Sequence, residues 1–164
     1  MASWRSDCAR RLLPAVEETA EHTKLWWGAA VVLSAAGWRG RRAATAGLAS
    51  MAVAELASNC VLKPVWNRRR PPKEWISHEE VDDRPDSSSF PSGHTAAGVG
   101  FSAAVAAVWP LAGAVCAVPA VAVAAERVHT GAHYPSDVAV GAAIGITSAA
   151  LVRRAPRLAL RLLR

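Results

Sequence analysis

Cysteine is scarce in this sequence, and its three copies suggest neither a disulfide framework nor a metal site. Cys8, Cys60 and Cys116 lack the spacing of metal ligands, and no pairing scheme follows from their positions. Cys60 and Cys116 lie inside apolar runs, so we expect them to be buried thiols. No long apolar segment precedes Leu25, which argues against a cleaved signal peptide.

Charge of either sign is missing from a long central stretch, from Thr95 to Ala125, although 20% of the chain is charged. As a single helix this stretch would be about 46 Å long, whereas the hydrocarbon core of a bilayer is about 30 Å thick. We therefore predict two membrane helices with a break at Trp109-Pro110, because proline disrupts a helix interior. The composition agrees with a membrane protein, since 52% of the residues are hydrophobic.

Lysine is also rare, with three copies against sixteen arginines, and the net charge is +6. A basic chain can indicate a nucleic-acid partner. Here the arginines do not lie on a soluble face interleaved with aromatic side chains, so we exclude nucleic acid. The excess of arginine, together with abundant alanine, is typical of a high-GC bacterial genome.

Five apolar segments predict an all-α fold, a polytopic transmembrane bundle of about five membrane helices. The segments cover roughly 25–38, 43–62, 95–109, 111–126 and 138–152. The 164 residues allow a single domain. Residues 1–23 are polar and mixed in charge, and we expect an interfacial N-terminal helix there. Residues 63–90 form a long polar loop, and residues 153–164 form a basic tail.

Three short polar clusters contain the groups that bind or attack a phosphate. They are Lys63-x6-Arg70-Pro71, Pro91-Ser92-Gly93-His94 and Arg127-x5-His133-x3-Asp137. Lysine and arginine neutralise phosphate charge, and the arginine fork adds directed donors. The backbone around Ser92 and Gly93 precedes an apolar helix, so its N–H groups can face an oxyanion. Each cluster alone has an ordinary explanation, but the three together indicate a phosphate site.

In their order and spacing, the three clusters resemble the type-2 phosphatidic acid phosphatase family, which includes bacterial membrane lipid phosphatases and is related to vanadium haloperoxidases. The resemblance covers residues 63–137 and implies a phosphatase that needs no metal and no cofactor. It implies that His133 is the nucleophile and forms a phosphohistidine, and that His94 protonates the leaving oxygen. Asp137 would fix the tautomer of His133 through the other ring nitrogen. The resemblance assigns the substrate phosphate to Lys63, Arg70, Ser92, Gly93 and Arg127.

Counting membrane crossings predicts that all three clusters meet at one side of the membrane. The opposite side carries Arg39, Arg41, Arg42, Arg153, Arg154, Arg157, Arg161 and Arg164. Because basic loops stay in the cytoplasm, we expect loop 63–90 to be extracytoplasmic and tail 153–164 to be cytoplasmic, in the cell membrane. We expect interface aromatics at both ends: Trp26, Trp27, Trp66 and Tyr134 on the cluster side, Trp38 and Trp109 on the other.

Two acidic residues depart from the expected pattern. The family commonly has serine before the arginine of its third motif, whereas this chain has Glu126, whose carboxylate would either pair with Arg127 or face away. Glu55 interrupts an apolar helix and shares a face with Asn59 and Lys63 at four-residue spacing. An internal polar contact and a proton or substrate role both remain open for Glu55.

The expected partners are the bilayer and a lipid-phosphate substrate, and the oligomeric state stays open. Candidate substrates are prenyl phosphates or diphosphates, phosphatidylglycerol phosphate, phosphatidate and decaprenyl phosphoribose phosphate. One alternative is a catalytically degenerate membrane protein that binds lipid. A second is a vanadate-dependent haloperoxidase, which would use the same anion pocket. Phosphate release and halide oxidation distinguish the three.

Overall fold

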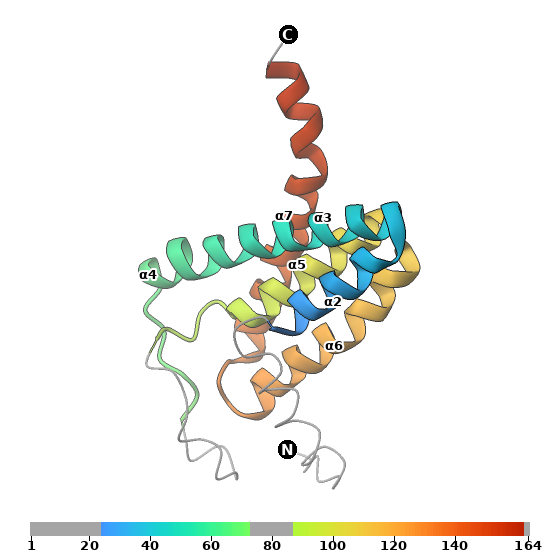
Figure 1. Cartoon of the computed structure of the whole chain (residues 1–164). Coiled ribbons are helices and arrows are strands. Elements are labelled where there is room, and N and C mark those ends of the chain that lie inside the picture. The colour runs from blue at the N-terminus through green and yellow to red at the C-terminus, as the bar shows by residue number, and fades with distance from the viewer. Residues whose placement is uncertain (1–23, 73–86, 163–164) are drawn as a thin grey trace, which may run out of the picture.

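The computed structural model of the protein describes residues 24–72 and 87–162, and every regular element in these ranges is a helix (Figure 1). In chain order the elements are α2 (Lys24–Ala35), α3 (Gly37–Glu55), the π-helix η2 (Leu56–Leu62), α4 (Lys63–Val65), α5 (Gly93–Val108), α6 (Pro110–His129) and α7 (Pro135–Leu162). The all-α prediction is therefore confirmed. The helix expected at 1–23 lies outside the described residues.

The first apolar segment corresponds to α2, and the second to the continuous helical run formed by α3, η2 and α4. The other three segments correspond to α5, α6 and α7. The predicted break in the uncharged stretch is present, because Trp109 has an extended backbone and Pro110 begins α6. Within the described ranges, three helical stretches are long and apolar enough to cross a membrane: Gly37–Val65, Pro110–His129 and Pro135–Ala155. The 12 residues of α2 and the 16 of α5 would span only about 18 Å and 24 Å.

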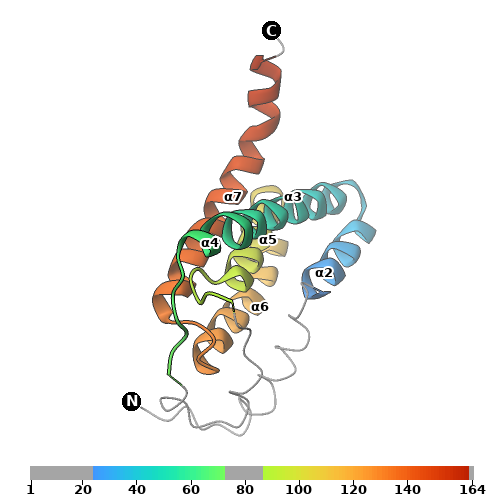
Figure 2. The same cartoon turned by 90° about the vertical axis from the view of Figure 1, so that its left-hand side faces the viewer.

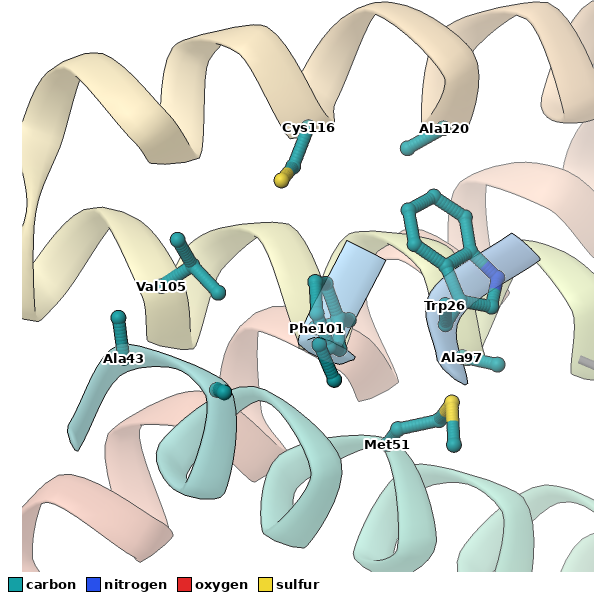
Figure 3. Packing of buried hydrophobic residues seen from close by; sticks show 10 residues of the cluster. Trp26, Ala43, Met51, Ala97, Phe101, Val105, Cys116 and Ala120 are labelled. Carbon is teal, nitrogen blue, oxygen red and sulfur yellow. The ribbon is translucent and has the colours of Figure 1, made fainter. Parts of the chain in front are cut away.

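Helix α5 lies at the centre of the bundle and packs against α3, α6 and α7 (Figures 1 and 2). Phe101 and Val105 of α5 are fully buried, and the Trp26 ring lies 5.4 Å from the Phe101 ring (Figure 3). The expectation that Trp26 lies at the membrane interface is wrong, because its side chain is only 2% exposed. Gly98 makes room for it: a Cβ at this position would lie 2.6 Å from the indole.

Glycines allow α7 to approach α5 closely. A Cβ at Gly145 would lie 2.6 Å from the Ala96 carbonyl oxygen, and one at Gly141 would lie 2.5 Å from the Ser92 carbonyl oxygen. Any side chain at either position would separate the two helices. Beyond this contact, the last turns of α7 extend past the other helices (Figures 1 and 2).

The outward faces of the helices expose many large apolar side chains, as contact with lipid requires. They include Val31, Val32, Leu56, Val61, Leu111, Val115, Val118, Val121, Ile146 and Leu151. Cys116 is buried as predicted, but Cys60 is exposed because it follows the outward face of η2 beside Val61.

The α2–α3 turn and the α5–α6 turn lie at one end of the bundle (Figure 1), and arginine and tryptophan side chains contact each other there. Arg39 donates from Nε to the Val108 carbonyl at 3.2 Å, and its guanidinium lies over the Trp109 ring at 5.6 Å. Arg42 lies over Trp38 at the same distance. Arg39 and Arg42 therefore lie beside Trp109 and Trp38, with which they were predicted to share one side of the membrane.

Candidate active site

The three polar clusters meet at the other end of the bundle, where α4, the start of α5 and the α6–α7 connection lie together (Figure 1). The Arg70 Nη1 donates to the Ala132 carbonyl at 2.7 Å, which joins the first cluster to the third. The Ser92 backbone N–H donates to the Asp137 carbonyl at 3.1 Å, which joins the second to the third. The predicted convergence of the clusters is confirmed.

His133 lies in the short connection between α6 and α7 and is 4% exposed. Its backbone N–H donates to the Arg127 carbonyl at 2.9 Å. Its ring Nδ1 lies 2.5 Å from the Ser89 carbonyl oxygen. A carbonyl only accepts hydrogen bonds, so Nδ1 carries the hydrogen in this contact. In the neutral ring, Nε2 then holds the lone pair that a nucleophile needs.

The surroundings of His133 keep its ring neutral. The pKa of His133 is lowered from 6.5 to about 3, chiefly because the ring is buried and next because of the positive charge of Arg70. Lys63 and His94 act in the same direction, whereas the hydrogen bond to Ser89 opposes them. Three predicted site residues, two from the first cluster and one from the second, therefore lie close enough to the predicted nucleophile to act on its charge.

The expected hydrogen bond between Asp137 and His133 is absent. Oδ2 of Asp137 lies 3.9 Å from Nδ1 of His133, beyond hydrogen-bond distance, and Nδ1 uses the Ser89 carbonyl instead. The Asp137 carboxylate is fully buried and has two other partners: Oδ1 accepts from Arg68 at 2.7 Å, and Oδ2 accepts the Tyr134 backbone N–H at 2.9 Å. The charged arginine donor explains this arrangement, because charge-assisted hydrogen bonds are stronger than neutral ones.

The predicted phosphate-binding arginines also hold the loops together. Besides its bond to Ala132, Arg70 donates from Nε to the Ser87 carbonyl at 3.2 Å. Arg127 is buried at the end of α6, and its Nε contacts Oε2 of the fully buried Glu126 at 2.5 Å. Of the two arrangements left open for Glu126, pairing with Arg127 is the one observed.

Ser92 caps α5, since its hydroxyl accepts the Thr95 backbone N–H at 3.5 Å and lies 3.0 Å from the Thr95 hydroxyl. The Ser92 amide itself is used by the Asp137 carbonyl, so an oxyanion would meet the first-turn amides of α5, which begin with Gly93. Gly93 permits a close approach, because a Cβ there would lie 2.9 Å from the Asn59 side-chain oxygen.

A π-helix brings Asn59 to this position. The sequence predicts one regular helix over 43–62, whereas residues Leu56–Leu62 form wider π turns. Such turns often occur at functional sites. Lys63 follows directly and is half-buried, and Glu55 lies just before the widened segment. The role of Glu55 stays a matter of prediction.

Two residues of the site were missed from the sequence. Ser89 acts through its backbone carbonyl, so its residue type carries no signal. Arg68 holds Asp137, and the only signal for it is the run of three arginines that ends in Arg70. Among residues 24–72 and 87–162, no three His, Cys, Asp or Glu side chains lie together as metal ligands would.

Comparisons with known proteins agree on one family. A family model described as the PAP2 superfamily matches residues 43–161. Two curated relatives, from Mycobacterium tuberculosis strains CDC 1551 / Oshkosh and ATCC 25618 / H37Rv, are both called decaprenylphosphoryl-5-phosphoribose phosphatase. Each is 36% identical over 92 residues, which cover 56% of this chain and 50% of the relative. The chain therefore spans about half the length of these relatives.

A solved structure shares the fold over almost the whole chain. It is described as the first transmembrane PAP2 type phosphatidylglycerolphosphate phosphatase from Bacillus subtilis, with a TM-score of 0.68 and 22% identity. The similarity covers 94% of this chain and 79% of the Bacillus protein. The family model, which matches most of the sequence and includes all three polar clusters, identifies this chain as a member of the PAP2 superfamily.

Proposed function

We propose that the protein is an integral-membrane phosphatase that hydrolyses lipid-linked phosphate monoesters or diphosphates through a phosphohistidine intermediate. The observation that carries this proposal is the state of His133. Its ring is buried and neutral, its Nδ1 donates to the Ser89 carbonyl, and Lys63 and Arg70 act on it from close by. A neutral imidazole beside fixed positive charge suits attack on an anionic phosphate, which carries its own charge into the site.

In the first step, Nε2 of His133 attacks phosphorus while the bond between phosphorus and the lipid oxygen breaks. His94 gives a proton to the departing oxygen, and the lipid alcohol, or the lipid monophosphate from a diphosphate, leaves. The ring becomes positively charged as the P–N bond forms. The buried Asp137 carboxylate, 3.9 Å from Nδ1, stabilises that developing charge by electrostatics rather than by a hydrogen bond.

In the second step, water attacks the phosphohistidine and the P–N bond breaks. His94, now without its proton, takes a proton from that water, so both histidines return to their starting states. Orthophosphate is released. The phosphate oxygens would be held by Lys63, Arg70, Arg127 and the first turn of α5, behind Ser92 and Gly93.

The substrate class follows from the membrane setting. The helices that carry the site have lipid-facing outer surfaces, so a phosphate attached to a membrane lipid reaches the site without leaving the bilayer. Both types of relative are named as phosphatases of lipid-borne phosphates. The substrates we favour are prenyl phosphates, phosphatidylglycerol phosphate and decaprenyl phosphoribose phosphate. We propose that the whole chain, residues 1–164, forms the single domain that acts on them.

We propose that the site faces the extracytoplasmic side of the cell membrane. The arginines of the opposite end, such as Arg39 and Arg42, lie beside Trp109 and Trp38, an arrangement typical of a membrane interface. Because basic segments stay inside, that end would be cytoplasmic. All five helices, including the short α2 and α5, would then cross or nearly cross the bilayer.

A phosphate-release assay with purified protein in detergent tests the proposal. Wild type and His133→Ala are compared on a panel of prenyl, glycerophospholipid and phosphoribosyl lipid phosphates. We expect release by wild type alone, with a phosphoenzyme trapped from radiolabelled substrate. Binding of lipid phosphates with no release would favour a degenerate lipid-binding protein, and bromide oxidation with vanadate and peroxide would favour a haloperoxidase.

A further inference from the structure

Arg68 contacts three residues of the segment that follows His133. Its Nη1 donates to Asp137 Oδ1 at 2.7 Å and to the Ser136 hydroxyl at 2.9 Å. Its guanidinium lies 4.1 Å from the centre of the Tyr134 ring. The side chain is 40% exposed, whereas the carboxylate that it holds is fully buried. One arginine therefore fixes the carboxylate, the hydroxyl and the ring beside the predicted nucleophile.

The backbone of Arg68 also supports the hydrogen bond that Nδ1 of the same histidine makes. The Arg68 carbonyl accepts the Ser89 backbone N–H at 3.0 Å, and the Ser88 hydroxyl accepts the Arg68 N–H at 3.2 Å. The Ser89 carbonyl in turn accepts the hydrogen of His133 Nδ1. The residue that fixes Asp137 thus also holds the backbone N–H of Ser89, the residue whose carbonyl decides the tautomer of His133.

We propose that Arg68 is a positioning residue for phosphoryl transfer, which holds the Asp137 carboxylate off the His133 ring while its backbone holds Ser89 against that ring. The inference rests on the proposed function and deepens it. Lysine would serve less well, because an ammonium cannot combine two directed hydrogen bonds with stacking on an aromatic face. The Arg68 charge also offsets the buried Asp137 carboxylate, which would otherwise act alone on the ring.

The charged groups around His133 decide whether loss of Arg68 favours the protonated or the neutral form of its ring. Asp137 on α7 favours the protonated ring, whereas Lys63, Arg70 and His94 favour the neutral ring. Arg127, at the end of α6, is bound to Glu126. Removing the Arg68 charge leaves the negative charge of Asp137 uncompensated, which raises the pKa of His133. The ring then binds a proton at Nε2, and loses its attacking lone pair, at a higher pH than in wild type.

Three variants test the inference: Arg68→Ala, Arg68→Lys and the matched control Arg69→Ala. Arg69 is exposed, and its hydrogen bond within residues 24–72 and 87–162 is made by its backbone carbonyl, which accepts the Ser89 hydroxyl. Arg68→Ala removes a charge that offsets Asp137, but it also releases the carboxylate from its position. We expect the loss of position to dominate and to lower kcat roughly 10- to 100-fold, the range for loss of a supporting partner, with KM and vanadate inhibition within about threefold of wild type. Arg68→Lys keeps the charge and should recover part of the loss. Arg69→Ala should match wild type.

The second measurement is titration of the His133 ring by NMR on ¹⁵N-histidine protein, with the signal assigned from its loss in His133→Gln. We expect the ring to titrate at higher pH in Arg68→Ala than in wild type, and to return in the double variant Arg68→Ala/Asp137→Asn. An unchanged titration in Arg68→Ala would overturn the inference, as would a raised KM with unchanged kcat, which would make Arg68 a substrate-binding residue. The titration needs no turnover. A wild type that releases no phosphate would therefore refute the proposed function, while the titration would still test the role of Arg68.

Discussion

Replacing Asp137 by asparagine separates two ways in which a carboxylate can assist a nucleophilic histidine. If the carboxylate selects the tautomer through a hydrogen bond, its loss exchanges the hydrogen between the ring nitrogens and removes the attacking lone pair. If it acts only through its charge, the tautomer survives and the transition state alone is weakened. The structure favours the second, because Nδ1 of His133 is bonded to the Ser89 carbonyl and lies 3.9 Å from Asp137.

The magnitude follows from that distance. Two unit charges 3.9 Å apart attract by about 4 kcal/mol at an effective dielectric constant of about 20. This attraction exists only when the ring is charged, and His133 is neutral before attack because its pKa is about 3. At 1.36 kcal/mol per tenfold change, the full term corresponds to a rate loss of about 10³-fold. Arg68, 2.7 Å from the same carboxylate, offsets part of it, so we expect a loss of roughly 10²- to 10³-fold.

The assay is single-turnover formation of the phosphoenzyme from radiolabelled substrate, in wild type and Asp137→Asn. Substrate affinity should change little, because Asp137 is fully buried behind the histidine. A ¹⁵N spectrum of the histidines at about pH 7 should show Nδ1 of His133 protonated in both proteins. Thermal unfolding shows whether any loss comes from the fold, since asparagine cannot replace both bonds of the carboxylate, to Arg68 and to Tyr134.

Two results would refute this reasoning. One is a shift of the His133 hydrogen to Nε2 in Asp137→Asn, which would mean that Asp137 and not Ser89 sets the tautomer. The other is a variant that forms phosphoenzyme at the wild-type rate while folding normally, which would mean that the buried charge does not act on the reaction. Asp137→Glu is a useful companion, since it keeps the charge and changes only its position.

Four further predictions concern pH, metals, orientation and the second histidine. Acid should destabilise the fold by about 2 kcal/mol at pH 5. Unfolded His133 binds a proton below its ordinary pKa of 6.5, whereas the folded ring stays neutral down to its pKa of about 3. The thermal stability of His133→Gln should not show this dependence on pH between 3 and 6.5. Activity should survive chelators and be inhibited by vanadate, and activity lost to chelation but restored by Mg²⁺ would contradict the metal-free mechanism. A cysteine introduced near Asp83, in a protein without its native cysteines, should react with an impermeant label from outside the cell while one near Arg157 should not; the reverse pattern would invert the orientation. His94→Ala should still transfer phosphate to His133 from p-nitrophenyl phosphate, whose leaving group needs no proton, and a variant equally dead on all substrates would argue against the acid role.

The helices could be predicted from the sequence because their signals are local. The apolar runs and Pro110 predict the number and order of the helices, which the structure confirms, but α3 begins six residues before the predicted segment and α7 ends ten residues after it. Trp26 was misjudged because a tryptophan near a helix start suits both an interface and a core. What decides is Gly98, distant in sequence, whose missing side chain leaves space for the indole. The π turns of η2 likewise have no signal in their residues that we recognise.

The sequence predicted which residues lie together at the candidate site, but not which hydrogen bonds they make. The spacing of His133 and Asp137 suggests a direct bond, yet the carboxylate goes to Arg68, which is 69 residues away in the chain. An arginine fork competes well for a buried carboxylate, because the pair satisfies two charges at once. The partner that the histidine takes instead is the Ser89 carbonyl, and every residue offers one, so no sequence pattern could indicate it.

The backbone of Ser92 connects the packing of α5 against α7 to the arrangement of the candidate site. Its N–H binds the Asp137 carbonyl, while its own carbonyl faces Gly141, where a Cβ would approach to 2.5 Å. The first turn of α5, which carries His94, is therefore held against the first turns of α7, which follow His133 directly. In the proposed reaction, this contact between α5 and α7 would keep the two histidines in place relative to each other. We therefore expect the proposed site to depend on Gly141, where any side chain would push α7 away from Ser92, as well as on its histidines.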